Sequence, residues 1–167
     1  PAAITGPGFT GGRQIREQVS LVDLTPTLLD AAGISVPEHM QGRSVVPVVN
    51  GQKEGWPEEA FIQISESHIG RAVRTGRWKY GVTSTEKPSR QDAGSDRYEE
   101  TFLYDLKHDP YELTNLIGLE SHQEVARILK GRLLRRMAEV GEKEPVIIEA
   151  QAQPGKQRRV TAAEALQ

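Results

Sequence analysis

The feature that most constrains this chain is an amphipathic segment at residues 122–140, which follows a series of strand patterns. Its large apolar side chains recur every three or four residues, so on a helix they form one stripe opposite a basic face. The stripe comprises Val125, Ile128, Leu129, Leu133, Met137 and Val140. Burial of one large apolar side chain is worth about 1.5–3 kcal/mol, so we expect this helix to lie on a sheet.

Four strand patterns precede that helix and predict the sheet. They cover residues 60–66, the two halves of RAVRTGRWKYGV (71–82) on either side of a tight turn at Thr75-Gly76, and TFLYDL (101–106). The stretch between the last two strands is polar throughout and predicts a long mobile loop. The sequence therefore predicts a four-stranded antiparallel sheet packed by a C-terminal helix, which is an α+β arrangement.

A short helix with clear start and stop signals is predicted near the N-terminus, in VSLVDLTPTLLDAAGI. Asp23 or Thr25 can cap it, and Pro26 fits its first turn, where a missing N–H does no harm. Gly33 stands where a left-handed residue ends a helix. Asp23 and Asp30 are about 10 Å apart along such a helix, too far to chelate one ion, so capping and solvation explain them better.

Further helix starts are predicted from the same kinds of signal. They are Ser44 as the cap of SVVPVVN (44–50) with Gly51 as its stop, Asp109 with Pro110 and Glu112 as a capping box, and Ser121 with Glu124 at the start of the long helix. Asp105, Asp109 and Glu112 could be imagined as an oxygen-ligand cluster, but the capping box accounts for two of the three. We therefore predict no metal ligands in this chain.

The composition excludes several classes of function. Basic and acidic residues number 21 and 23, so no net field would draw the protein to nucleic acid. The apolar runs are far below the ~20 residues that cross a bilayer. There is no cysteine, hence no disulfide, thiolate metal site or cysteine nucleophile. No phosphate-binding glycine loop or serine elbow is present, and the sequence predicts no catalytic residue.

The organisation of the chain predicts a piece of a larger fold. PAAITGPGFTGG, residues 1–12, is typical of the last strand of an upstream sheet entering a loop. The polar, turn-rich segment 51–59 predicts a boundary between a first part, 1–50, and a sheet-plus-helix subdomain, 51–141. The tail, 142–167, has no clear period and is expected to be an extended arm or a disordered end.

Among the four histidines, His68 is the strongest candidate for ligand binding, because a loop at the end of a rigid sheet is where substrate contacts tend to lie. His39, His108 and His122 are expected to be solvated at the surface. The histidines have no spacing typical of a zinc site. Trp78 and Tyr80 alternate on one face of a strand and are expected in the core.

Three segments together resemble one family, in matching order and spacing. They are VSLVDLTPTLLDAAGISVPEHMQGRSVVPVVNG, RAVRTGRWKYGV and LYDLKHDPYELTNL. They resemble the C-terminal portion of sulfatase-family hydrolases, which have an alkaline-phosphatase-like α/β domain and a smaller C-terminal domain of antiparallel sheet plus helix. The resemblance implies that residues 1–50 are the edge of the large domain, contributing a strand and short helices, and that the catalytic domain lies upstream in the same protein.

The resemblance also implies chemistry that this chain does not contain. In the family, a formylglycine made from a C-x-P-x-R or S-x-P-x-R motif attacks the sulfate ester, and calcium or a similar ion polarises the sulfate oxygens. EKPSR, residues 86–90, reproduces only the end of that motif, because Glu86 cannot become an aldehyde. By resemblance, this portion completes the fold and supplies one wall of the pocket for an anionic sulfate ester.

The residues expected to bind substrate in that wall are His68 and Arg71, from loop 65–70 and the strand after it. Arg71 could equally decorate an exposed strand face. Two other functions stay open: a stand-alone binding or oligomerisation module, with a homo-oligomer possible, and part of a phosphonate monoester or phosphodiester hydrolase of the same superfamily. The isolated chain is expected to be inactive.

Overall fold

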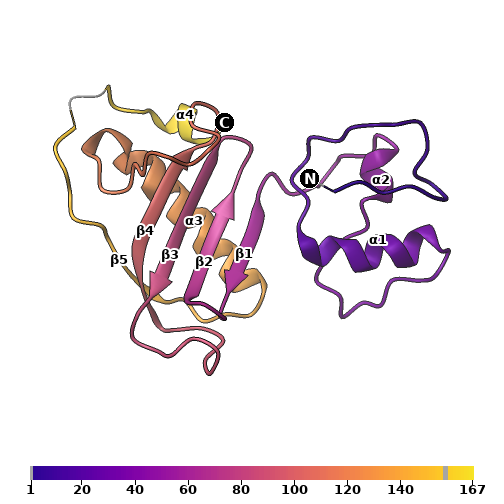
Figure 1. The fold of residues 1–167 in the computed structure, drawn as a ribbon, viewed down its shortest axis with the longest axis horizontal. Coiled ribbons are helices and arrows are strands. Elements are labelled where there is room, and N and C mark those ends of the chain that lie inside the picture. Colours follow the sequence, from indigo (N-terminus) through magenta and orange to yellow (C-terminus); the bar gives the residue numbers. More distant parts are fainter. Residues whose placement is uncertain (1, 156–157) are drawn as a thin grey trace. The chain divides into compact units, whose positions relative to one another are not determined.

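The computed structural model describes residues 2–155 and 158–167 of the chain. The chain forms two compact units, residues 1–60 and 61–167. The first unit holds two short helices, and the second holds the sheet and the long helix (Figure 1). Among the described helices, none is both long and apolar enough to cross a membrane.

The first unit contains the helix predicted near the N-terminus. A 3-10 turn, Leu21–Asp23, leads directly into α1, Leu24–Ala31. Gly33 has φ +72°, and the amides of Gly33 and Ile34 donate to the carbonyls of Asp30 and Leu29. This closing pattern confirms the predicted left-handed stop. The second helix, α2, spans Val46–Val49.

A polar network, and a close backbone approach, hold these two helices together. The buried Asp23 carboxylate accepts from the amides of Ser20 (2.8 Å) and Arg43 (2.9 Å). The fully buried Thr27 hydroxyl donates to Asp23 O and accepts from the amide of Val45 (2.9 Å). A Cβ on Gly42 would lie 2.0 Å from Val22 O, so only glycine fits there. Asp23 stands at the N-cap position of α1, as predicted, but its side chain makes no capping hydrogen bond to that helix and instead joins Ser20 and Arg43.

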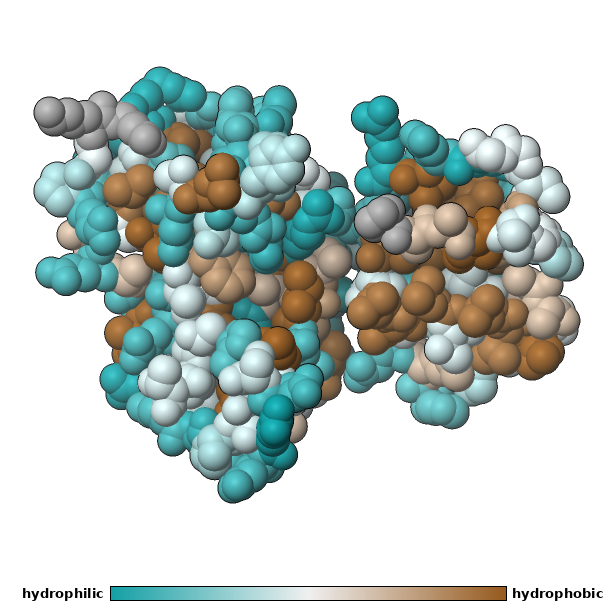
Figure 2. Space-filling view, in the orientation of Figure 1, coloured by the Kyte–Doolittle hydropathy of each residue, from teal (hydrophilic) through white to brown (hydrophobic). Residues whose placement is uncertain are grey.

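Large apolar side chains remain exposed in the first unit. Leu21, Val22, Leu28 and Ile34 are 84%, 57%, 62% and 55% exposed. Figure 2 shows a band of apolar side chains across the unit that carries α1 and α2. Residues 2–5 form no strand, contrary to the prediction, and the nearest pairing is an isolated bridge between Gly6 and Phe9. A strand needs a neighbour to hydrogen-bond with, and the described chain gives residues 2–5 none.

The second unit is built on a five-stranded sheet in the order β1-β2-β3-β4-β5. The strands span Ala60–Ile64, Ile69–Arg74, Trp78–Ser84, Arg97–Asp105 and Val146–Ile148. β2, β3 and β4 are antiparallel, and the β2–β3 turn contains the predicted Thr75-Gly76. β5 is parallel to β4, so the sheet is mixed but mostly antiparallel. The four predicted strands are confirmed, and a fifth is added.

The long helix α3, Gln123–Glu139, covers one face of this sheet (Figure 1). Its stripe meets the core-facing side chains of the strands. The fully buried members of this core include Val73, Trp78, Tyr80, Leu103, Leu129 and Leu133. Gly141 ends the helix at φ +82°. The predicted packing of the helix on the sheet, and the core positions of Trp78 and Tyr80, are confirmed.

Two predicted helix starts are wrong. Glu112 has φ +57° in a turn, so no capping box forms there; Asp109 instead accepts from the amide of Thr114 (2.8 Å). At the start of α3, the residue before the helix is His122 and no side chain caps it. The Ser121 hydroxyl contacts His122 Nδ1 at 2.9 Å instead. In both places a tertiary or neighbouring partner competes successfully for the polar side chain.

The tail, 142–167, was expected to be an arm or a disordered end, but its described residues are integrated into the second unit. β5 pairs with β4, and the amide of Val160 donates to Ser121 O (2.8 Å). A short helix, α4, spans Ala162–Ala165; Ala165 is fully buried, and Trp78 Nε1 donates to Glu164 O (2.9 Å). These contacts link positions far apart in sequence, which a local pattern does not reveal.

Candidate functional site

His68, the first predicted binding residue, lies in the turn between β1 and β2. Its side chain is exposed, and its Nδ1 lies 3.0 Å from the Ser67 hydroxyl. A Cβ on Gly70 would lie 3.1 Å from His68 Nε2, so the imidazole sits beside the glycine's bare backbone. The turn therefore presents an accessible imidazole at one end of the sheet.

Arg71, the second predicted binding residue, is 4% exposed near the start of β2. Its Nε donates to both carboxylate oxygens of Glu142 (2.8 and 3.1 Å). Its Nη1 donates to Gly70 O and its Nη2 to Ala93 O, both at 2.8 Å. The guanidinium also lies over the Tyr98 ring, 5.9 Å from its centroid. Protein acceptors therefore hold the guanidinium from three directions.

The structure does not bring His68 and Arg71 side by side. Successive residues of a strand point to opposite faces of the sheet, so Gly70 and Arg71 face opposite ways. The His68 ring lies on the side toward which a Gly70 Cβ would point. His68 and Arg71 thus border the same strand end from opposite faces, an arrangement that sequence spacing alone did not reveal.

A polar hollow of about 600 Å³ adjoins Arg71. Its lining comes from β1, β2, the loop before β4 and the start of the tail: Gln63, Ser65, Arg71, residues 93–96, Glu142 and Lys143. Amide, hydroxyl and charged groups of both signs line it. Such a lining suits a polar, hydroxylated ligand better than an apolar one.

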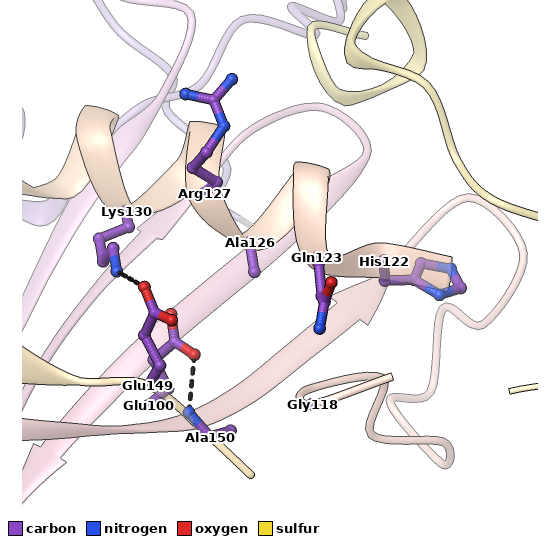
Figure 3. A pocket seen from close by; sticks show the side chains of 9 residues that line it. All are labelled: Glu100, Gly118, His122, Gln123, Ala126, Arg127, Lys130, Glu149 and Ala150. Atoms are coloured by element: carbon purple, nitrogen blue, oxygen red, sulfur yellow. Dashed lines mark hydrogen bonds and ion pairs between the residues drawn. The ribbon is translucent and has the colours of Figure 1, made fainter. Parts of the chain in front are cut away.

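A second hollow, of about 230 Å³, lies between α3 and the strand β4 (Figure 3). Its charged groups already have partners in the protein. Lys130 pairs with Glu149 at 2.7 Å, and Glu100 accepts from the Tyr80 hydroxyl (2.9 Å) and from the amide of Ala150 (3.0 Å). Burial raises the pKa of Tyr80, and the nearby Glu100 charge raises it further. These contacts fasten the tail to α3 and β4.

The remaining histidines divide between surface and interior. His39 and His108 are exposed, as predicted. His122 was predicted to be solvated but is 7% exposed, and its ring packs edge-on against Trp78 with centroids 6.1 Å apart. Burial lowers the pKa of His122, so the neutral imidazole is favoured. The 3-10 turn before α3 directs this ring into the end of the core.

Asp105, one of the three acids that could be imagined as an oxygen-ligand cluster, is held by an arginine. Arg77 donates to its carboxylate through Nε (3.1 Å) and Nη2 (2.8 Å), and His108 Nδ1 lies 2.9 Å from it. Burial by itself raises the pKa of Asp105, but these hydrogen bonds outweigh burial and hold the pKa below its ordinary value. Within residues 2–155 and 158–167 no group of three potential ligands gathers around one point. The calcium ion implied by the resemblance thus has no fitting donor set there.

The sequence reasoning missed Glu142 and the backbone of loop 85–96 as partners of this region. Glu142 follows the glycine that ends α3, in a tail without periodicity, and Ala93 contributes only its carbonyl. One signal was available: an arginine on the core-facing side of a strand needs an acid. The identity of that acid depends on the path of the tail.

Comparisons with known proteins find related sequences and structures. The sequence profile described as N-sulphoglucosamine sulphohydrolase, C-terminal, matches residues 3–139. Human arylsulfatase K is 33% identical over 126 residues, covering 70% of this chain and 22% of that protein. Choline-sulfatase of Rhizobium meliloti (strain 1021) is 36% identical over 120 residues, covering 70% of this chain and 21% of that protein. The chain thus spans about a fifth of these relatives.

Solved structures share the fold. BT4656, solved in complex with its substrate D-glucosamine-2-N,6-O-disulfate, matches with a TM-score of 0.60 at 23% identity, over 74% of this chain and 24% of that one. BT1596, described as a 2-O GAG sulfatase, matches with a TM-score of 0.54 at 28% identity, over 70% of this chain and 24% of that one. The fraction of each solved chain that is matched, 24%, is thus similar to the fraction of each curated relative that is matched.

Proposed function

This chain belongs to the N-sulphoglucosamine sulphohydrolase C-terminal family, and from that premise we propose that it is the non-catalytic C-terminal part of a sulfatase. The observation that best supports this proposal is the profile match over residues 3–139, which includes all three segments that resemble the family. The proposed full-length protein hydrolyses a sulfate ester. In it, this chain completes the fold and forms one wall of the substrate pocket.

The first proposed role is to complete the large domain. Leu21, Val22 and Leu28 are more than half exposed in and just before α1. Contiguous exposed apolar side chains mark a contact surface in a soluble protein. We propose that the upstream catalytic domain of the same protein covers them, and that residues 1–50 are the edge of that domain.

The second proposed role belongs to loop 65–70, with His68. An exposed imidazole can donate a hydrogen bond to a sulfate oxygen or to a sugar hydroxyl. BT4656 binds a disulfated glucosamine and BT1596 is described as acting on glycosaminoglycan, so we propose a sulfated carbohydrate as the substrate class. The formylglycine and the calcium ion of the proposed enzyme would then belong to the upstream domain.

The test compares this chain with the full-length protein that carries it. We expect the full-length protein to hydrolyse glucosamine 6-sulfate and the 167-residue chain alone to be inactive in calcium buffer. Turnover by the chain alone would overturn the proposal. Faster turnover of bis-p-nitrophenyl phosphate than of any sulfate ester would favour the phosphodiesterase alternative. A full-length protein without hydrolytic activity would favour the binding module.

The wall itself is tested by His68→Ala in the full-length protein. We expect the variant to raise KM for glucosamine 6-sulfate several-fold, because a hydrogen bond to the bound substrate is lost. His39→Ala is the matched control, since His39 is also exposed but lies in the first unit. An unchanged KM in His68→Ala would remove loop 65–70 from the substrate pocket.

A further inference from the structure

Three residues from separate segments belong to one hydrogen-bonded cluster with the buried cation Arg71. Arg71 of β2 donates to Glu142 of the tail and to Ala93 O of loop 85–96, and Gln63 of β1 donates to the same Glu142 carboxylate. We refer to Gln63, Arg71, Ala93 and Glu142 as the Arg71 clamp. A buried arginine needs such partners, because an unpaired charge out of water is costly.

Loop 85–96 depends on polar contacts for its position, since its sequence TEKPSRQDAGSD offers almost no apolar side chains. Besides the clamp, the amide of Ser95 donates to the Tyr98 hydroxyl (3.0 Å), and the Ser84 hydroxyl donates to that of Ser95 (3.0 Å). In the contact with Arg71, the donor is both charged and buried. Charge-assisted hydrogen bonds are the strong ones, so the clamp is a strong anchor of the loop.

The same loop touches the proposed substrate wall. The amide of Arg90 donates to Ser65 O at 2.7 Å, and the Arg90 guanidinium lies 4.0 Å from Glu66. Arg90 has φ +70°, an uncommon conformation for a residue with a side chain, which surrounding contacts must maintain. Whatever fixes loop 85–96 therefore also fixes the backbone that precedes His68.

We infer that Arg71 is a positioning residue: from the opposite face of the sheet it anchors loop 85–96, and through that loop it sets the place of loop 65–70 and His68. This inference rests on the proposed function, because it gives a role to the same wall. The sequence predicted that Arg71 binds the substrate directly. In this proposal it acts on the substrate pocket only through the loop. Glu142 lies outside the matched residues 3–139, so the clamp uses a segment beyond the shared family region.

The anchoring is tested by amide hydrogen exchange on the 167-residue chain, without any substrate. We expect Arg71→Gln and Glu142→Gln to speed exchange in loop 85–96 by about tenfold or more, because a buried charge-assisted hydrogen bond is lost, while α3 keeps its protection. Arg71→Lys should loosen the loop as well, since an ammonium group cannot reproduce the geometry with which the guanidinium donates to acceptors in three directions. The control Arg97→Gln removes an exposed ion pair with Glu86 of the same loop and should change little.

Unchanged exchange in loop 85–96 in these variants would overturn the inference, and so would equal loss of protection in α3, which would indicate general unfolding. Gly94→Ala is a second approach to the clamp, because its Cβ would lie 2.9 Å from Arg71 Nη2. We expect that variant to speed exchange in the loop without removing any charge.

The consequence for function is tested in the full-length protein with glucosamine 6-sulfate. Arg71→Lys should raise KM several-fold and leave kcat nearly unchanged, as expected for a residue that acts through the position of the wall. Faster loop exchange with an unchanged KM would overturn the proposed wall but not the anchoring. An unchanged rate of loop exchange would overturn the anchoring while leaving the proposed sulfatase function intact.

Discussion

The two units of this chain are held together in different ways. The second unit has a continuous apolar core in which Trp78, Leu129 and Leu133 are fully buried between sheet and helix. The first unit relies on the Asp23 carboxylate, the Thr27 hydroxyl and the close approach of Gly42 to Val22. Hydrogen bonds and backbone contacts specify a shape, but they leave Leu28 of α1, and Leu21 and Val22 just before it, more than half exposed.

The comparison shows that a unit can be ordered without burying all of its large apolar side chains. The second unit buries the apolar stripe of α3 against its own sheet, so the hydrophobic effect stabilises this unit from within. The first unit is ordered locally while Leu21 and Leu28 face outward. These two exposed side chains are among those that we propose the upstream domain covers. Substitutions and a change of pH can test this contrast, beginning with the largest expected effect.

Leu133→Ala should destabilise the second unit by about 2–5 kcal/mol, because it leaves a cavity in a tightly packed core. Native-state hydrogen exchange should show lower free energies of opening for β3 and α3, and unchanged values for the amides of Arg43 and Val45 in the first unit. Leu166→Ala, at a side chain that is 58% exposed, serves as the control. Equal losses in both units would contradict the contrast.

Gly42→Ala should destabilise the first unit by about 1–3 kcal/mol, since the added Cβ collides with the backbone of Val22 and that backbone must shift. The same exchange experiment should show faster exchange at the amide of Arg43. Gly131→Ala is the matched control: a Cβ there meets nothing within 4 Å, in the interior of α3. It should stabilise the second unit by about 1 kcal/mol. An unaffected first unit in Gly42→Ala would contradict the prediction.

The stability of the second unit should fall as the pH is lowered below about 6.5, the ordinary pKa of histidine. Burial lowers the pKa of His122 in the folded state, so in this range the unfolded chain binds a proton that the folded chain does not. The loss should level off below the folded-state pKa. Urea unfolding between about pH 7.5 and pH 5 should show this slope, and His122→Gln should reduce it. An unchanged slope in that variant would assign the effect to other groups.

Leu28→Ser should change the stability of the isolated chain by less than about 0.5 kcal/mol, whereas the substitution of the buried Leu133 should destabilise it far more. The Leu28 side chain is 62% exposed, so little burial is lost. Urea unfolding of the chain measures this. In the full-length protein, the same variant should lower the midpoint of thermal unfolding if the upstream domain covers α1. A large loss in the isolated chain would show that α1 is already covered.

Much of the second unit could be predicted from the sequence because its signals are local. The stripe on α3, the alternation around Trp78 and Tyr80, and the stop at Gly141 each depend on a few neighbouring residues. The candidate site was predicted less well. Loop 65–70 was identified at a strand end, but the division of its two residues between opposite faces was not foreseen.

By itself, the sequence determined the first four strands of the sheet, the helix that covers it, and the family that the chain resembles, because periodicity and turn chemistry act over a few residues. Only the tertiary structure decided the fifth strand, the burial of His122, and the partners of Arg71. Each of these depends on where the tail and loop 85–96 return to the sheet. Glu142 follows Arg71 by 71 residues, and no local pattern encodes a contact across that separation.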